Sequence, residues 1–217
     1  MSRQYKQEQD KKNIIKLREL QSGLPTFMKD YFIYLTESRQ LSSVSVLGYA
    51  RDLETFCYFL KENNPEISNY SDITPEKLEN LRPQDIAEYM AFLTLYEKNG
   101  EIQKNTANGK ARKLSAIKTF WKWMIGFDIV NNNPTLLITP PKQKKKEIVK
   151  LEKDEIQTVL NGVKTGDSLA EERARKYSKN INKRDLAMIS LFLATGIRVS
   201  ECVGIDIKDI SFKDNSV

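Results

Sequence analysis

Near its C-terminal end the sequence reads Ala194-Thr195-Gly196-Ile197-Arg198-Val199-Ser200-Glu201. Residues 186–193, just before it, are apolar nearly all round, which predicts a helix buried on every side. Gly196 is the residue type that ends such a helix, and the next helix is predicted to present Arg198 at its start. A permanently charged guanidinium on a rigid helical scaffold is suited to bind the non-bridging oxygens of a phosphate.

Glu201 follows Arg198 at the i+3 spacing, so we expect its carboxylate to orient the guanidinium through a charge-assisted pair. Thr195 and Gly196 are expected to support the turn. The spacing alone also fits a solvent-exposed cap and a routine helix-surface ion pair, because short motifs match by chance.

The first half of the chain is predicted to be helical almost throughout. Apolar residues recur at helical spacing in residues 24–38, 42–60, 83–93 and 106–124. Ser42 and Thr74 have N-cap chemistry, a further helix is expected to start at Thr106, and prolines follow Thr74 and open the segment at residue 83. Four or five helices over about 100 residues predict a small all-α bundle.

The predicted organisation has four parts. An N-terminal arm covers residues 1–23, a helical domain residues 24–130, a basic proline-containing linker residues 131–149, and a second domain residues 150–217. In the second domain we expect a helix at 152–160 ended by Gly162, a loop or frayed helix at 165–181, and a β-hairpin starting after Ile210.

Positive charge gathers in one part of the sequence. Residues 101–150 contain eleven lysines or arginines and three acidic residues, a net charge of +8 in a chain whose total is +6. A local basic excess of this kind is typical of a surface that meets nucleic acid. The residues expected to contact DNA, mostly through phosphates, are Lys104, Asn105, Thr106, Asn108, Lys110, Arg112, Lys113, Lys118, Lys142, Lys144, Lys145 and Lys146. Among these Asn105, Thr106 and Asn108 are also candidates for reaching base edges.

Composition excludes several other classes of function. The chain has no histidine and two distant cysteines, Cys57 and Cys202, so a zinc site is not expected. The few cysteines also lead us to expect that the protein is located in the reducing cytoplasm. There is no glycine-rich phosphate loop, no signal-peptide pattern and no apolar run of membrane-spanning length. We therefore expect no metal, no small-molecule cofactor and no membrane partner.

Several segments in order resemble the tyrosine recombinases, the Xer and phage integrase family. Residues 184–201, with the Thr195-Gly196-Ile197-Arg198 turn, resemble the first signature box of the catalytic domain, and residues 205–210 its entry into a β-hairpin. Residues 32–56 resemble the opening helices of the core-binding domain. Residues 112–120, followed by Asn133-Pro134, resemble its last DNA-facing helix and exit.

The resemblance implies a mainly α fold, with an N-terminal SAM-like helical core-binding domain and the N-terminal part of an α+β catalytic domain. It implies double-stranded DNA as partner, self-assembly with other recombinase protomers on DNA, and strand exchange through a phosphotyrosyl link without cofactor. Arg198 would be the first catalytic arginine, with Glu201 in a supporting position.

The sequence departs from the family pattern after Arg198. The family's hairpin lysine, its His-x-x-Arg box, its second His or Trp and its tyrosine nucleophile all follow that arginine. Here histidine is absent and all nine tyrosines precede Arg198, so these 217 residues alone are not expected to cleave DNA.

Two other functions remain open at this point. Residues 186–204 also fit a helix-turn-helix outline, which would make the chain a non-catalytic, dimeric DNA-binding regulator. A competitor that occupies recombination sites is the other alternative. The aromatic residues Phe120, Trp121 and Trp123 fit either bundle core or platforms for stacking bases, and Cys202 is expected to be a small buried apolar residue.

Overall fold

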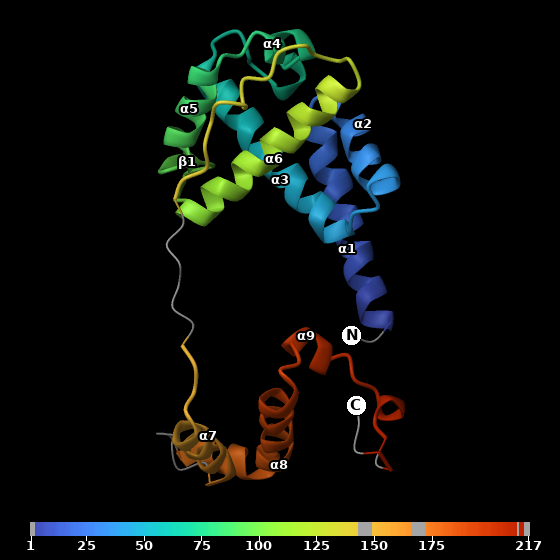
Figure 1. Cartoon of the computed structure of the whole chain (residues 1–217), viewed down its shortest axis with the longest axis vertical. Helices are drawn as coiled ribbons and strands as arrows, with labels where there is room; N and C mark the ends of the chain where they lie inside the picture. Colours follow the sequence, from blue (N-terminus) through green and yellow to red (C-terminus); the bar gives the residue numbers. More distant parts are fainter. Residues whose placement is uncertain (1–2, 143–148, 166–171, 212, 215–217) are drawn as a thin grey trace. The chain divides into compact units, whose positions relative to one another are not determined.

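The computed structural model describes residues 3–142, 149–165, 172–211 and 213–214. Nearly all of its regular structure is helical, as predicted (Figure 1). The chain divides into two compact units, one of residues 9–145 and one that takes in residues 146–217. Each is described by itself below. No helix among the described residues is long and apolar enough to cross a membrane.

The first unit is a helical bundle with one small hairpin. Its elements, in chain order, are α1 (Arg3–Gly23), α2 (Met28–Ile33), a π-helical turn η1 (Tyr34–Ser38), α3 (Ser43–Asn63), a 3-10 turn η2 (Tyr70–Asp72), α4 (Pro75–Glu79), α5 (Pro83–Phe92), the strands β1 (Tyr96–Lys98) and β2 (Glu101–Gln103), and α6 (Ala107–Gly126). The long helices α3 and α6 cross and pack against each other (Figure 1).

The predicted helix starts are confirmed by their caps. The hydroxyl oxygens of Ser42, Thr74 and Thr106 accept hydrogen bonds from backbone N–H groups three residues later, at 3.3, 3.4 and 3.2 Å. Each bond satisfies one of the N–H groups that a helix start leaves without a partner. These caps set where α3, α4 and α6 begin and therefore which faces they present.

The core of this unit is rich in aromatic side chains. Phe120 and Trp121 are fully buried and Trp123 is 5% exposed, so the core interpretation of these three residues is confirmed. Phe56 of α3 meets Trp121 edge-on with ring centroids 5.7 Å apart, and meets Tyr89 of α5 at 5.1 Å. None of these rings is available to stack on a base.

The hairpin between α5 and α6 was not predicted. β1 and β2 pair antiparallel, and Asn99 and Gly100 connect them with φ of 54° and 79°. Positive φ at both central residues is the geometry that favours Asn-Gly in two-residue hairpins. On the neighbouring α3, the Tyr58 hydroxyl donates a hydrogen bond to the carbonyl oxygen of Glu97 at 2.8 Å.

The first half of the segment predicted to be a linker packs on the helical bundle. Residues 131–138 return past α4 and pack on the first unit (Figure 1). The amide nitrogens of Asn131 and Asn132 donate to the side-chain and backbone oxygens of Glu79, and Thr135 is buried. This segment is therefore a strap across the bundle, because Asn131, Asn132 and Ile138 make hydrogen bonds to residues of α4 and α6.

The predicted N-terminal arm is a helix. In α1 the side chains of Leu17 and Leu20 pack against the core, and Ser43 at the start of α3 donates a hydrogen bond to Asp10 at 2.6 Å. The polar sequence concealed this helix because only a narrow stripe of it is apolar.

The second unit contains α7 (Lys153–Thr165), α8 (Glu172–Thr195), the short α9 (Val199–Cys202) and a 3-10 turn η3 (Ile207–Asp209). α7 continues through Gly162, where we expected it to end, since an internal glycine weakens a helix without terminating it. α8 begins at Glu172, inside the stretch expected to be a loop or frayed helix. Among the described residues after Ile210 there is an isolated bridge at Ser211 and no strand, and residues 212 and 215–217 lie outside the description.

The expected burial of residues 186–193 is wrong for this structure. Met188 is 37% exposed and Leu193 40% exposed, and Cys202, also expected to be buried, is half-buried. α8 packs against α7. A helix that is apolar all round needs neighbours on several sides to be buried, and one packed helix covers a single face.

Candidate nucleic-acid interface and phosphate-binding arginine

The basic residues of α6 and of the segment before it lie mostly on the surface. Lys104, Arg112 and Lys122 are exposed, and Lys110 and Lys118 are half-buried. The Lys110 ammonium donates to the Thr94 hydroxyl, and the Lys118 ammonium donates to the carbonyl oxygen of Ile138 at 2.6 Å. Both partners are neutral, so the hydrogen bonds hold these two ammonium groups in place without cancelling their charge.

Lys113 does not belong to this surface, contrary to the sequence-based expectation. It is 8% exposed, and its ammonium donates to a carboxylate oxygen of Asp52 at 3.1 Å and to the hydroxyl of Thr55 at 3.4 Å. Asp52 is itself 2% exposed. Lys113 is therefore a buried ion-pair partner, because a buried cation is stable only beside a compensating charge.

Two of the three candidate base-reading residues have structural tasks at the start of α6. The side-chain amide of Asn105 donates to the carbonyl oxygen of Leu93 at 3.0 Å, and Thr106 provides the helix cap. Asn108 is exposed and makes no hydrogen bond through its side chain within the described part of the chain. Of the three, Asn108 is the one whose side chain is free to meet a base edge.

The basic linker is described only at its start. Lys142 is exposed. Lys144, Lys145 and Lys146 lie outside the described residues.

A hollow beside α6 joins the helix to the strap. Lys118 and Lys122 of α6 face Asn131–Asn133 across a space of about 610 Å³. The side-chain oxygen of Asn133 accepts both the N–H and the hydroxyl of Thr135, at 3.0 and 2.7 Å. Two ammonium groups four residues apart on one side of the hollow make it electropositive.

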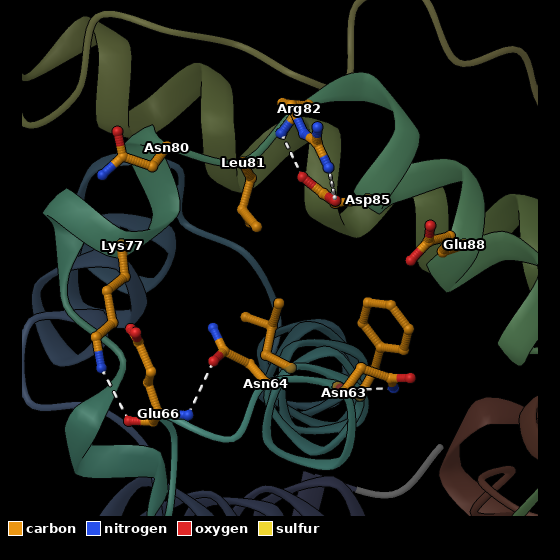
Figure 2. Close-up of a pocket in the computed structure, with 11 residues that line it drawn as sticks. Asn63, Asn64, Glu66, Lys77, Asn80, Leu81, Arg82, Asp85 and Glu88 are labelled. Carbon is orange, nitrogen blue, oxygen red and sulfur yellow. Dashed lines mark hydrogen bonds and ion pairs between the residues drawn. The ribbon is translucent and has the colours of Figure 1, made fainter.

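A second hollow, of about 360 Å³, lies where the end of α3 meets α4 and α5, and both acidic and basic residues line it (Figure 2). Arg82 pairs with Asp85 at 3.4 Å, and the Lys77 ammonium donates to the carbonyl oxygen of Glu66 at 3.2 Å. Glu88 lines it as well. Acidic and basic groups of similar number give this hollow no preference for a polyanion.

In the second unit, a glycine turn places Arg198 as the sequence predicts. Gly196 has φ of +65°, and its N–H donates to the carbonyl oxygen of Phe192 at 2.9 Å, which ends α8. The Thr195 hydroxyl donates to the carbonyl oxygen of Leu191 at 2.6 Å and accepts the N–H of Ile197 at 3.2 Å. Any other residue at position 196 would have to adopt this left-handed backbone conformation, which is unfavourable for residues with a Cβ.

Arg198 and Glu201 are bound to each other at the start of α9. The Arg198 N–H donates to one carboxylate oxygen of Glu201 at 2.8 Å, and its guanidinium donates to the other at 3.1 Å. Hydrogen bonds from that N–H and then from the guanidinium lower the pKa of the Glu201 carboxyl. The Arg198 side chain is 81% exposed, so its remaining N–H groups are open to an incoming anion.

Among the residues that the structure describes, no group of three or more acidic, cysteine or histidine side chains is placed to hold a metal ion.

Comparisons with known proteins match both units separately. The phage integrase N-terminal SAM-like domain matches residues 28–126, and the phage integrase family matches residues 149–217. The chain is 26% identical over 195 residues to a tyrosine recombinase XerC of Caldanaerobacter subterraneus, which aligns with 86% of this chain and 50% of that protein. It is 27% identical over 196 residues to XerC of Escherichia coli, aligning with 90% of this chain and 56% of that protein.

A tyrosine recombinase XerD of Oceanobacillus iheyensis is 27% identical over 183 residues, with 84% of this chain and 52% of that protein aligned. The chain thus spans about half the length of these curated relatives. No solved structure matches.

Proposed function

The chain belongs to the phage integrase family of tyrosine recombinases, with a SAM-like helical domain and part of an integrase catalytic domain, and from this premise we propose a function. The chain is the DNA-binding and early catalytic part of a site-specific recombinase, which cleaves and rejoins DNA strands through a phosphotyrosyl intermediate. Its partners are double-stranded DNA and other recombinase protomers assembled on that DNA.

The observation that carries this proposal is the state of Arg198. Its guanidinium is exposed, and the carboxylate of Glu201 holds it at the start of a helix. A planar guanidinium can donate to two non-bridging oxygens of a phosphate at once, and it keeps its charge at any physiological pH. As charge builds on those oxygens during attack on phosphorus, a fixed cation stabilises the transition state more than the ground state.

Four cations on α6 and on the segment before it support binding to duplex DNA. Lys104, Lys110, Lys118 and Lys122 have no carboxylate partner among the described residues, so their charges are available to backbone phosphates. Contacts of this kind fix the position of a protein on the duplex and leave base reading to a few other side chains, here Asn108.

We propose that the 217 residues alone bind DNA without cleaving it, because all nine tyrosines precede Arg198. Fluorescence anisotropy with a labelled duplex at several salt concentrations measures binding. A nicked duplex that traps the covalent intermediate, followed by denaturing electrophoresis, measures cleavage. We expect salt-dependent binding and no protein–DNA adduct. A tyrosine-linked adduct would refute the second part, and an absence of binding at low salt would refute the first.

The regulator alternative receives less support from the second unit. A helix-turn-helix protein lays its second helix in the major groove. Here the helix after the Gly196 turn, α9, has four residues, Val199–Cys202. Light scattering of the free chain separates the two alternatives, since a regulator is expected to be a dimer and a recombinase protomer a monomer without DNA. A competitor of a recombinase would bind the same sites and would lower the rate of recombination by the whole enzyme.

A further inference from the structure

A groove runs between α3 and α6 of the first unit. It has a volume of about 380 Å³, and small side chains border it on both sides. Its lining residues are Ser45, Gly48, Tyr49 and Asp52 of α3 and Arg112, Ser115 and Ala116 of α6. Apart from Gly48, its chain neighbours and the nearby backbone of α3, no atom lies within 4 Å of the position that a Cβ on Gly48 would take, so the groove is open there.

The groove contains a buried carboxylate that forms ion pairs with two cations. Asp52 is 2% exposed, and its two carboxylate oxygens go to different partners: one to the Lys113 ammonium, the other to an Nη of Arg112. A buried carboxylate without partners would be costly, and Lys113, which is also buried, already supplies one compensating charge. The charge of Arg112 therefore exceeds what the acid needs, and the cluster has a net charge of +1.

Arg112 differs from Lys113 in its exposure. The Arg112 side chain is 58% exposed and the Lys113 side chain 10%. One Nη of Arg112 is bound to Asp52, which leaves the other edge of the planar guanidinium to donate outward. A long side chain held at one end loses less conformational entropy when it binds than a free one, which favours affinity.

From this geometry we propose that the α3–α6 groove is a subsite for one backbone phosphate of duplex DNA, with Arg112 as its anchor and Asp52 as the positioning residue for Arg112. The inference rests on the proposed function, since it assigns a place on the DNA-binding surface. The small residues at Ser45, Gly48 and Ser115 let the sugar-phosphate strand approach the guanidinium closely. Lys113 stays paired with Asp52 inside the bundle and does not touch the DNA.

The test uses variants of the whole chain, of which the first keeps the net charge and the others each remove one positive charge. Asp52→Leu/Lys113→Met replaces the buried pair with apolar side chains, a change that buried ion pairs often tolerate, and leaves Arg112 without its support. Lys113→Met alone keeps the Asp52–Arg112 pair, and Arg112→Ala removes the anchor. Lys61→Ala, at an exposed lysine near the other end of α3, is the matched control for loss of one positive charge.

Binding to a labelled duplex is measured by anisotropy at four or more salt concentrations, with circular dichroism melting of every variant. We expect Arg112→Ala to weaken binding about tenfold and to reduce the slope of log K against log salt by about 0.9. The Asp52→Leu/Lys113→Met variant should show most of that loss at unchanged net charge, and only the small remainder should follow when Arg112→Ala is added. Lys113→Met and Lys61→Ala should keep the slope within a few tenths of the original chain.

If Arg112→Ala matches Lys61→Ala in slope, the subsite is refuted while the proposed function stands. If Asp52→Leu/Lys113→Met binds like the original chain, Asp52 has no positioning role. Should that double variant fail to fold, Gly48→Leu, which fills the groove from a solvent-open position, is the second test: tight binding with Leu at position 48 would overturn the proposal. A chain that binds no DNA at low salt refutes the proposed function itself.

Discussion

The electrostatic contribution of α6 and the segment before it to DNA binding can be predicted quantitatively from four lysines without a carboxylate partner among the described residues. Consider the simultaneous replacement of Lys104, Lys110, Lys118 and Lys122 by glutamine. If each contacts one phosphate, the slope of log K against log salt falls by about 0.9 for each, or about 3.6 in total. Between 50 and 200 mM salt, the original chain should then lose about 150-fold more affinity than the variant.

The matched control removes the same charge from elsewhere on the first unit. Lys11, Lys16, Lys29 and Lys61 are exposed on α1, α2 and α3, and their replacement by glutamine lowers the net charge equally. Long-range attraction depends on net charge and would change alike in both variants, whereas counterion release depends on which lysines contact phosphate. Anisotropy titrations at four salt concentrations give both slopes.

Equal slopes for the two variants would refute the assignment of α6 to the interface. Stability must be checked as well, because Lys118 also donates to the carbonyl oxygen of Ile138 and anchors the strap. Loss of that one hydrogen bond is expected to cost about 1 kcal/mol. Binding measured at 10 °C below the lowest melting temperature of the set keeps unfolding out of the comparison.

Three smaller predictions concern the scaffold. Thr106→Ala removes the α6 cap and should cost about 1 kcal/mol in urea unfolding, whereas Ser would retain it. Trp121→Ala should cost about 3–5 kcal/mol because the ring is fully buried; weakened DNA binding with unchanged stability would instead indicate a stacking role. By NMR, the Glu201 carboxyl should titrate below its ordinary pKa and move upward in Arg198→Ala. Since its pKa is lowered in the folded state, the stabilisation it gives is present above the unfolded pKa and lost as pH falls through the folded pKa. An ordinary pKa for Glu201 would contradict the paired geometry.

The features that sequence predicted well are those fixed by a few neighbouring residues. Ser42 and Thr106 cap helices because their hydroxyls reach N–H groups three residues ahead, whatever the rest of the chain does. Gly196 ends α8 for a similarly local reason, its positive φ. The hairpin at Asn99-Gly100 had an equally local signal, but its strands have three residues each and include charged side chains, so no alternating apolar pattern accompanied the turn.

What sequence could not predict depends on residues far apart along the chain. Lys113 reads as one more cation on a basic helix, and only its contact with Asp52, 61 residues away, shows that it is buried. The strap is another case. Asn131 and Asn132 have the composition of a free linker, and their partner Glu79 lies more than 50 residues earlier. Local pattern specifies helices, but which side chain of a helix meets which acid is decided by packing.

The net charge of a sequence segment does not give the number of its residues that can contact DNA. The sequence from residue 101 to 150 has a net charge of +8, yet within the described residues Lys113 is buried against Asp52 and Arg112 shares that acid. Counting every basic residue there as a phosphate contact would therefore overestimate the salt dependence of binding. Asp52 lowers the number of free positive charges. If it also positions Arg112, however, it strengthens the binding of phosphate by that residue, because a guanidinium already held in place binds phosphate at a smaller entropic cost. The measured slope should then be lower than the charge count implies, while the loss on removing Arg112 should exceed the loss on removing any single exposed lysine of α6.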